Sequence, residues 1–393
     1  MKTESAKRLA AIQPSPTMAI NARAKELAAA GRKILNLSAG EPDFATPAHI
    51  CEAAADALKK GATHYTAADG TPELKRAIAG KLRRENGLEY AAEEIIASCG
   101  VKQSLYNLCL AFLNPGDEAL ITSPYWVSYP AQVKLAGAEP RILPCSADNG
   151  FKLTPEQLAA AIGRKTRLLI LNSPNNPSGA VYSRTELEAL AKVLTKHDNV
   201  LIATDDIYEH LLYDDSDFVD IVMAAHALRD RTVVMNGVSK SYAMTGWRLG
   251  YAAGPAWLVT AMKKLQSQST SNPASVSQAA AVAALEGDQA CVAEMRAMFR
   301  YRRDRFIAAL NEANGVHCEL PPGAFYAFAD CREAIAARGL DGDLAFAQWL
   351  LEEPEIAAVP GSAFGMSGYV RFSYASDQAT LDEAAARLKR ALA

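Results

Sequence analysis

The chain has 393 residues, half of them hydrophobic, and a formal net charge of −3 at neutral pH. This length exceeds what one hydrophobic core usually covers, so we expect two domains. The near-neutral charge argues against a basic face that binds nucleic acid, and no apolar run is long enough to span a bilayer.

The N-terminal segment and the cysteines indicate the cellular compartment of the protein. The first eight residues contain charges but no apolar stretch follows them, so we expect no signal peptide. Seven scattered cysteines form no Cys-x-x-Cys pair, and six histidines form no pair with metal-ligand spacing. These features predict reduced thiols, a cytoplasmic location and no structural metal site.

Strand and helix signals alternate from about residue 70 to about residue 255. Thr71-Pro72 predicts a helix start and Asn86-Gly87 its end, and a second helix is expected over 102–113. Residues 94–100 predict a strand followed by a turn, and four more apolar runs predict strands over 119–122, 167–172, 200–204 and 232–235. Capping boxes that begin at Thr154 and Ser183 mark helices between them. This order is typical of a mostly parallel sheet with helices on both faces, which binds ligands at the carboxyl ends of its strands.

The chain changes character after about residue 285. A long charged helix is expected over 289–311, followed by strands over 324–329 and 369–374. A capping box that begins at Thr380 predicts the start of the last helix. We therefore predict a large α/β domain of residues 46–285 and a smaller α+β domain made of residues 1–45 and 286–393.

Lys240 lies just past the apolar run 232–235, where an ordinary surface charge is badly placed. Partial burial lowers the pKa of a lysine amine, which suits a nucleophile that bonds an aldehyde. Arg248 follows eight residues later and offers the planar fork that binds a phosphate. Together they suggest pyridoxal phosphate (PLP), although Lys240 alone also fits a structural lysine at the surface.

Polar residues follow other predicted strands as well. Asp205 comes directly after the strand 200–204, where it could meet a protonated pyridine, cap a helix or accept a salt bridge. Gly100 precedes a helix whose first amides could hold a phosphate. Asn176 lies in a Pro/Gly turn after the strand 167–172, and Arg371 lies inside an apolar strand, where it could complete an ion pair or bind a carboxylate.

These segments occur in an order that resembles class I aminotransferases of PLP fold type I, from about residue 30 to the C-terminus. The branch that looks most similar is the prokaryotic aspartate aminotransferases. The resemblance rests on seven motifs: Gly40-Glu-Pro-Asp43, Tyr65, Pro124-Tyr-Trp126, Asn175-Asn176-Pro-Ser-Gly179, Asp205-x-x-Tyr208, Ser239-Lys240 with Arg248, and Arg371-Phe-Ser.

The resemblance implies how the cofactor is held. Lys240 would bond the aldehyde and then move the substrate proton as general base and acid. Asp205 would keep the pyridine nitrogen protonated. Further contacts would come from a set around the ring and phosphate: Trp126 by stacking, Tyr208 and Asn176 at the 3-oxygen, and Arg248 with the backbone of Val101 and Lys102 at the phosphate. Some branches carry a phosphate-binding serine where this chain has Gly237, so Ser239 either supplies that contact or it is absent.

The resemblance also implies how substrates and a second subunit are bound. Arg371 would bind the α-carboxylate of the amino acid beside the Gly40 backbone, with Trp126 and Asn176 completing the substrate site. Tyr65 would reach the phosphate of the neighbouring subunit, which predicts a homodimer with shared active sites. Lys102 is a candidate for the distal carboxylate of the substrate, or it solvates a helix start. A core tryptophan is the alternative interpretation of Trp126.

We therefore expect a cytoplasmic, homodimeric PLP enzyme that transfers the amino group of L-aspartate to 2-oxoglutarate in a ping-pong reaction. Within the family, the alternatives are other amino donors, among them aromatic amino acids, alanine, kynurenine or prephenate. A PLP lyase would share Lys240, Asp205 and Arg248. A non-catalytic PLP-fold regulator is a third possibility, but it would need a DNA-binding segment for which the N-terminus has no room. The resemblance also suggests a cis bond between Asn176 and Pro177.

Overall fold

The computed structural model describes residues 5–12, 14, 16–214 and 217–393. Its largest sheet has seven strands, six of which run in one direction, whereas β8 (Gly250–Ala253) runs antiparallel to both of its neighbours. Across the sheet the order is β2 (Ile95–Ser98), β8 (Gly250–Ala253), β7 (Thr232–Gly237), β6 (Leu201–Asp205), β5 (Thr166–Asn172), β3 (Glu118–Ser123) and β4 (Glu139–Pro144). The mostly parallel sheet is confirmed, whereas β4 and β8 were not predicted.

The central strands are apolar throughout because both faces of the sheet are covered by helices. Leu168 and Ile170 of β5 enter one hydrophobic core, and Leu169 and Leu171 enter another. The first core includes α4 (Val101–Phe112) and α9 (Ala256–Ser267), and the second includes α3 (Pro72–Asn86), α6 (Pro155–Ala161), α7 (Arg184–Leu194) and α10 (Ser275–Glu286). This alternation follows from the two-residue repeat of an extended strand.

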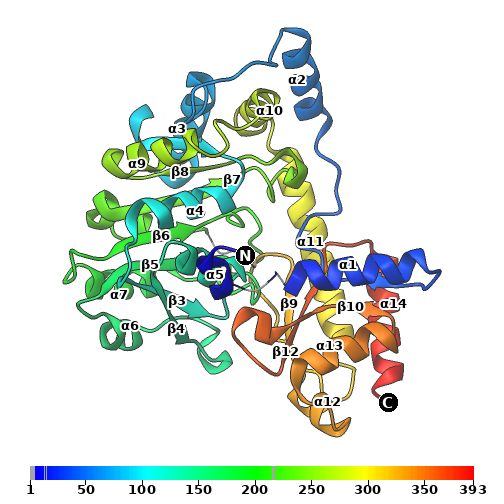
Figure 1. Cartoon of the computed structure of the whole chain (residues 1–393). Helices are drawn as coiled ribbons and strands as arrows, with labels where there is room; N and C mark the ends of the chain where they lie inside the picture. Colours follow the sequence, from blue (N-terminus) through cyan, green and yellow to red (C-terminus); the bar gives the residue numbers. More distant parts are fainter. Residues whose placement is uncertain (1–4, 13, 15, 215–216) are drawn as a thin grey trace, which may run out of the picture.

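The long helix α11 (Ala290–Leu310) leads from the large sheet to the C-terminal part of the chain (Figure 1). A three-stranded antiparallel sheet there has the order β11 (Val359–Pro360), β12 (Tyr369–Ser373) and β9 (Tyr326–Asp330). The helices in this part are α12 (Arg332–Ala337), α13 (Gly342–Glu352) and α14 (Gln378–Ala391).

The N-terminal segment lies beside this C-terminal part, as Figure 1 shows for α1 (Pro16–Ala29). Strand β1 (Leu35–Asn36) pairs in parallel with β10 (Ile356–Ala357). The remaining α-helices are α2 (Ala48–Lys59), α5 (Ser128–Leu135) and α8 (Ile221–Ala224). In the described part of the chain, no helix is both long and apolar enough to cross a membrane.

Two predicted boundaries are wrong for local reasons. The last helix begins at Gln378, because the carboxylate of Asp377 accepts the backbone N–H of Thr380 at 2.9 Å and so caps the helix earlier than a box at Thr380 would. Strand β9 begins at Tyr326, because Ala324 has a φ of +58°, which no strand residue adopts. The Asn176–Pro177 peptide bond is cis, as the resemblance suggested.

The cap of α14 makes a testable prediction about stability. Asp377→Ala leaves the first-turn amides without their acceptor and should lower the free energy of unfolding by about 1 kcal/mol in urea denaturation. Asp377→Asn is the matched control, because asparagine caps helices about as well as aspartate. An equal loss in both variants would contradict the assignment of this cap.

Candidate active site

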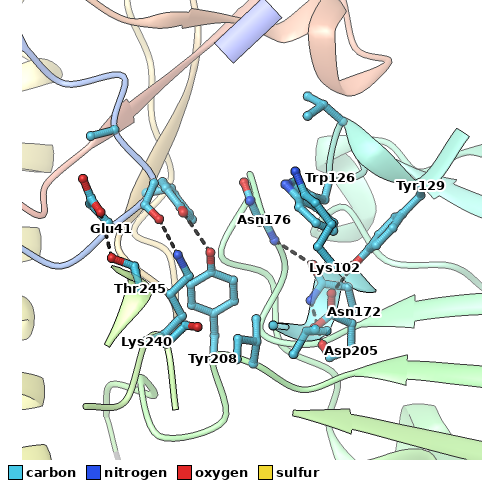
Figure 2. A pocket seen from close by; sticks show the side chains of 18 of the residues that line it. Glu41, Lys102, Trp126, Tyr129, Asn172, Asn176, Asp205, Tyr208, Lys240 and Thr245 are labelled. Carbon is cyan, nitrogen blue, oxygen red and sulfur yellow. Dashed lines mark hydrogen bonds between the residues drawn. The ribbon is translucent and has the colours of Figure 1, made fainter. Parts of the chain in front are cut away.

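A cavity of about 360 Å³ lies where β5, β6 and β7 end. Figure 2 shows Lys240 and Tyr208 on one side of it and Trp126, Tyr129 and Asp205 on the other. The cavity is lined by nearly all the residues that the sequence predicts for the site: Gly40, Val101, Lys102, Trp126, Asn176, Asp205, Tyr208, Ser239, Lys240, Arg248 and Arg371. Tyr65 is the exception.

Lys240 lies just past the end of β7 and projects into the cavity (Figure 2). Its ammonium group donates a hydrogen bond to the carbonyl oxygen of Gly40. Burial lowers the pKa of Lys240 to about 8; the charge of Glu41 opposes this shift, while those of Arg371 and Arg248 add to it. Near neutral pH, more of this amine is therefore unprotonated and nucleophilic than of an ordinary lysine, although most of it still carries its proton.

Asp205 is the last residue of β6 and is buried at the cavity wall. Tyr129 donates a hydrogen bond to its Oδ2 at 2.7 Å, whereas its Oδ1 has no hydrogen-bond partner among the described residues. Burial raises the pKa of Asp205 to about 6, even though the bond from Tyr129 lowers it. A buried carboxylate oxygen without a partner fits a cationic N–H donor such as a protonated pyridine.

Arg371 lies in β12 and brings a buried guanidinium to the cavity. It donates to Asn176 Oδ1 at 2.9 Å and to the carbonyl of Ser38 at 2.8 Å, while its Nε has no partner. Among the described residues, no carboxylate forms an ion pair with it, so the structural ion pair considered from the sequence does not form. An uncompensated buried cation is suited to binding an anionic ligand.

The N-terminus of α4 and Arg248 form an anion seat at one end of the cavity. Helix α4 begins at Val101 after Gly100, which has a φ of +85° and no side-chain cap. A Cβ on Gly100 would lie 2.7 Å from Nη2 of Arg248, so only glycine lets the guanidinium approach this closely. Free first-turn amides beside a guanidinium suit a phosphate.

Lys102 and Trp126 lie together on the cavity wall. The Lys102 ammonium is 4.8 Å from the centre of the Trp126 ring, a cation–π contact. Burial lowers the pKa of Lys102, and the nearby charge of Arg248 lowers it further. Trp126 is half-buried: it packs against the hydrophobic core and also lines the cavity beside this cation.

Tyr65 lies outside the cavity lining and is 89% exposed. The segment that carries it is nevertheless fixed. The Gln278 side chain donates to Thr66 Oγ1 at 2.9 Å and accepts the N–H of Thr71 at 2.8 Å, and Asp69 pairs with two lysines. A role of Tyr65 in a neighbouring subunit stays a prediction.

The sequence reasoning did not identify several residues of the cavity. Tyr129, Asn172 and Tyr326 line it, as do Ser38, Glu41 and Thr245. Tyr129 lies three residues after Trp126, about one helical turn beyond the Pro124-Tyr-Trp126 motif, and this position could have indicated it. Tyr326, whose hydroxyl lies 2.8 Å from that of Tyr208, gives no sequence signal because it resembles any strand tyrosine.

Asp205 makes a prediction about stability and pH. Because its pKa of about 6 exceeds that of an unfolded aspartate (about 3.9), the folded chain loses stability as the pH rises through this interval. Asp205→Asn removes that loss. In urea unfolding of the cofactor-free protein, we compare the free energy of unfolding of the variant with that of the unchanged protein. This difference should shift in favour of the variant by about 2 to 3 kcal/mol from pH 4 to pH 7. A constant difference between the two proteins at both pH values would contradict the raised pKa.

Comparison with known proteins assigns the family. The model of the family "Aminotransferase class I and II" matches residues 32–388. The chain is 52% identical to an aspartate/prephenate aminotransferase of Nitrosomonas europaea, over 97% of this chain and 98% of that protein. Solved structures of aspartate aminotransferases are also similar. The enzyme from Rhizobium meliloti has a TM-score of 0.96 at 46% identity, with 99% of both chains covered. The enzyme from Thermus thermophilus with maleate has a TM-score of 0.94 at 41% identity, with 99% of this chain and all of that chain covered. With the cavity and its lysine, these matches show that the chain belongs to the class I and II aminotransferases.

Proposed function

We propose that this aminotransferase uses PLP and transfers the amino group of L-aspartate to 2-oxoglutarate, giving oxaloacetate and L-glutamate in a ping-pong reaction. The observation that carries the proposal is the pairing of two groups in one cavity. Lys240 has an amine with a lowered pKa, and Asp205 has a buried carboxylate oxygen without a partner.

The cavity residues fit the cofactor at both of its ends. Asp205 would hold a protonated ring nitrogen, and Arg248 with the amides of Val101 and Lys102 would hold the phosphate, with Ser239 beside it. Trp126 would cover one face of the ring, and Tyr208 and Asn176 would contact its 3-oxygen. When bound, PLP supplies an aldehyde that bonds amines and a ring that accepts electrons from the substrate Cα.

The chain's own groups would orient the substrate and move its proton. Arg371 has a free Nε, so its fork can take a carboxylate while its other nitrogens stay bonded to Asn176 and Ser38. Arg371 and Lys240 line the same cavity, so a carboxylate held by Arg371 would bring the substrate Cα toward Lys240. The Lys240 amine would remove the proton from Cα and return it at the cofactor carbon.

A second cation in the cavity supports a dicarboxylic substrate. Lys102 lies above Trp126, on the cavity wall. It is the candidate for the distal carboxylate, in agreement with a related enzyme whose structure was solved with maleate, a dicarboxylate. Prephenate is the second candidate substrate, because it also carries two carboxylates and a relative at 52% identity is named an aspartate/prephenate aminotransferase.

We further propose a large domain of residues 46–285 and a small domain of residues 1–45 and 286–393. The seven-stranded sheet lies wholly within the first range, and β1 pairs with β10 of the second part. An exposed Tyr65 on a fixed segment supports a homodimer with shared sites. Seven free cysteines support a reducing, cytoplasmic environment.

The proposal is tested by the absorption spectrum of the purified protein before and after addition of L-aspartate alone. A visible band of bound PLP should convert to the shorter-wavelength band of the cofactor's amino form. Lys240→Ala should retain bound PLP but lose turnover by at least about 10³-fold, because it lacks the base. Absence of a visible band after PLP is added would contradict the cofactor, and a band unchanged by aspartate would contradict the donor.

Lys102 offers a test of the dicarboxylic substrate. Lys102→Met keeps the apolar stem over Trp126 but removes the charge, and should raise KM for L-aspartate about 10- to 100-fold by loss of a charge-assisted hydrogen bond. Activity toward L-alanine, which lacks a distal carboxylate, should change by less than about twofold. Lys134→Met, at an exposed position outside the cavity lining, is the matched control. Equal losses with both donors would contradict the assignment.

A further inference from the structure

The segment that follows β6 has two sides. Asp205 and Tyr208 line the cavity, whereas Glu209 and His210 do not and instead contact α3. Glu209 is buried, and His210 is partly exposed at the surface. The segment that carries Asp205 and Tyr208 is therefore also held by contacts on its side away from the cavity.

Glu209 and His210 connect this segment to the one that carries Lys240. Asn236, in β7, donates its Nδ2 hydrogen to Glu209 Oε1 at 2.7 Å. His210 Nδ1 and the hydroxyl of Ser241 share a hydrogen bond of 2.8 Å. Ser241 is the residue directly after Lys240, so these two bonds fasten the Lys240 segment on both sides of the lysine.

Helix α3 anchors both connections. The Lys81 ammonium donates to Glu209, and Asn86 Nδ2 donates to the other oxygen of Glu209 at 3.1 Å. Glu85 accepts a 2.9 Å hydrogen bond with His210 Nε2. Burial alone would raise the pKa of Glu85, but the bond from His210 and the charge of Lys81 lower it to about 2, so this anchor stays ionised at neutral pH.

Two other roles for this cluster are excluded by its geometry. Glu85, His210 and Ser241 lie in the order of an acid–base–nucleophile chain, but Ser241 is only 1% exposed and no substrate can reach it. Glu85, Glu209 and His210 lie close enough together to hold a cation, but the Lys81 ammonium already contacts both carboxylates. The cluster is thus occupied by its own lysine.

We propose that His210 is a positioning residue: its hydrogen bond with Ser241 holds the backbone of Lys240 in register with the segment that carries Asp205 and Tyr208. Lys240 needs a mobile side chain to move a proton and a fixed backbone to return to the same place. The bond at Ser241 fixes the backbone of Lys240 without restricting its side chain. The catalytic part of this inference rests on the proposed function; the structural part does not.

Two substitutions separate the two nitrogens of His210. His210→Asn places an amide where Nδ1 lies and keeps the contact with Ser241, whereas His210→Gln places it near Nε2 and keeps the contact with Glu85. Ser241→Ala removes the same bond from the other side and serves if His210→Gln does not fold. Each full-length variant is measured by hydrogen–deuterium exchange of the peptide that covers residues 237–242, with an α3 peptide as reference, and by kcat and KM for L-aspartate.

His210→Gln and Ser241→Ala should exchange the 237–242 amides about five- to tenfold faster and lose a similar factor in kcat, with KM within about twofold, since a hydrogen bond contributes about 1 kcal/mol. His210→Asn should stay near the unchanged protein in both measurements. Equal behaviour of the asparagine and glutamine variants, or unchanged exchange in both Ser241→Ala and His210→Gln, would overturn the proposal. If the unchanged protein turns over no amino acid, the proposed function fails, and exchange alone still decides whether His210 holds the segment.

Discussion

The structure depends on burying three ionisable side chains in one cavity, although none of them has a complete set of ion-pair or hydrogen-bond partners. Among the described residues, Lys240 and Arg371 form no ion pair, and one oxygen of Asp205 accepts no hydrogen bond. Burying such groups is unfavourable, so the free energy must come from the two cores that cover the sheet. Asp205 and Lys240 can be satisfied by one ligand that carries a cationic ring nitrogen and an aldehyde, and Arg371 by a carboxylate; such ligands stabilise the fold on binding.

The direction of the strands explains why the site could be predicted from motifs that lie far apart. Parallel strands end at the same edge of the sheet, so Asn172, Asp205 and Lys240, at or just past the ends of three adjacent strands, meet in space. The apolar runs that predicted these strands are buried on both faces, which makes their sequence signal strong. For these reasons, the fold class and the cavity lining were largely predictable.

What the sequence did not reveal depends on packing between distant segments. Strand β8 consists of small residues and one tyrosine, and β4 contains two prolines and has an exposed edge, so neither has a strand-like pattern. Tyr129 and Tyr326 reach the cavity from a helix and from the C-terminal sheet, and only their contacts with Asp205 and Tyr208 distinguish them from core residues. The ion pair between Lys81 and Glu209 joins residues 128 positions apart, which no local pattern encodes.

The fixed segment around Tyr65 has a consequence for any surface that packs against it. Because the buried Gln278 already bonds Thr66 and the N–H of Thr71, the tyrosine is displayed on a backbone with little freedom left to lose. Ordering of a loop commonly offsets part of the free energy of association. Here the segment is already ordered in the folded chain. Contacts made by the aromatic ring would therefore contribute more to affinity than the same contacts made by a loop that becomes ordered on binding.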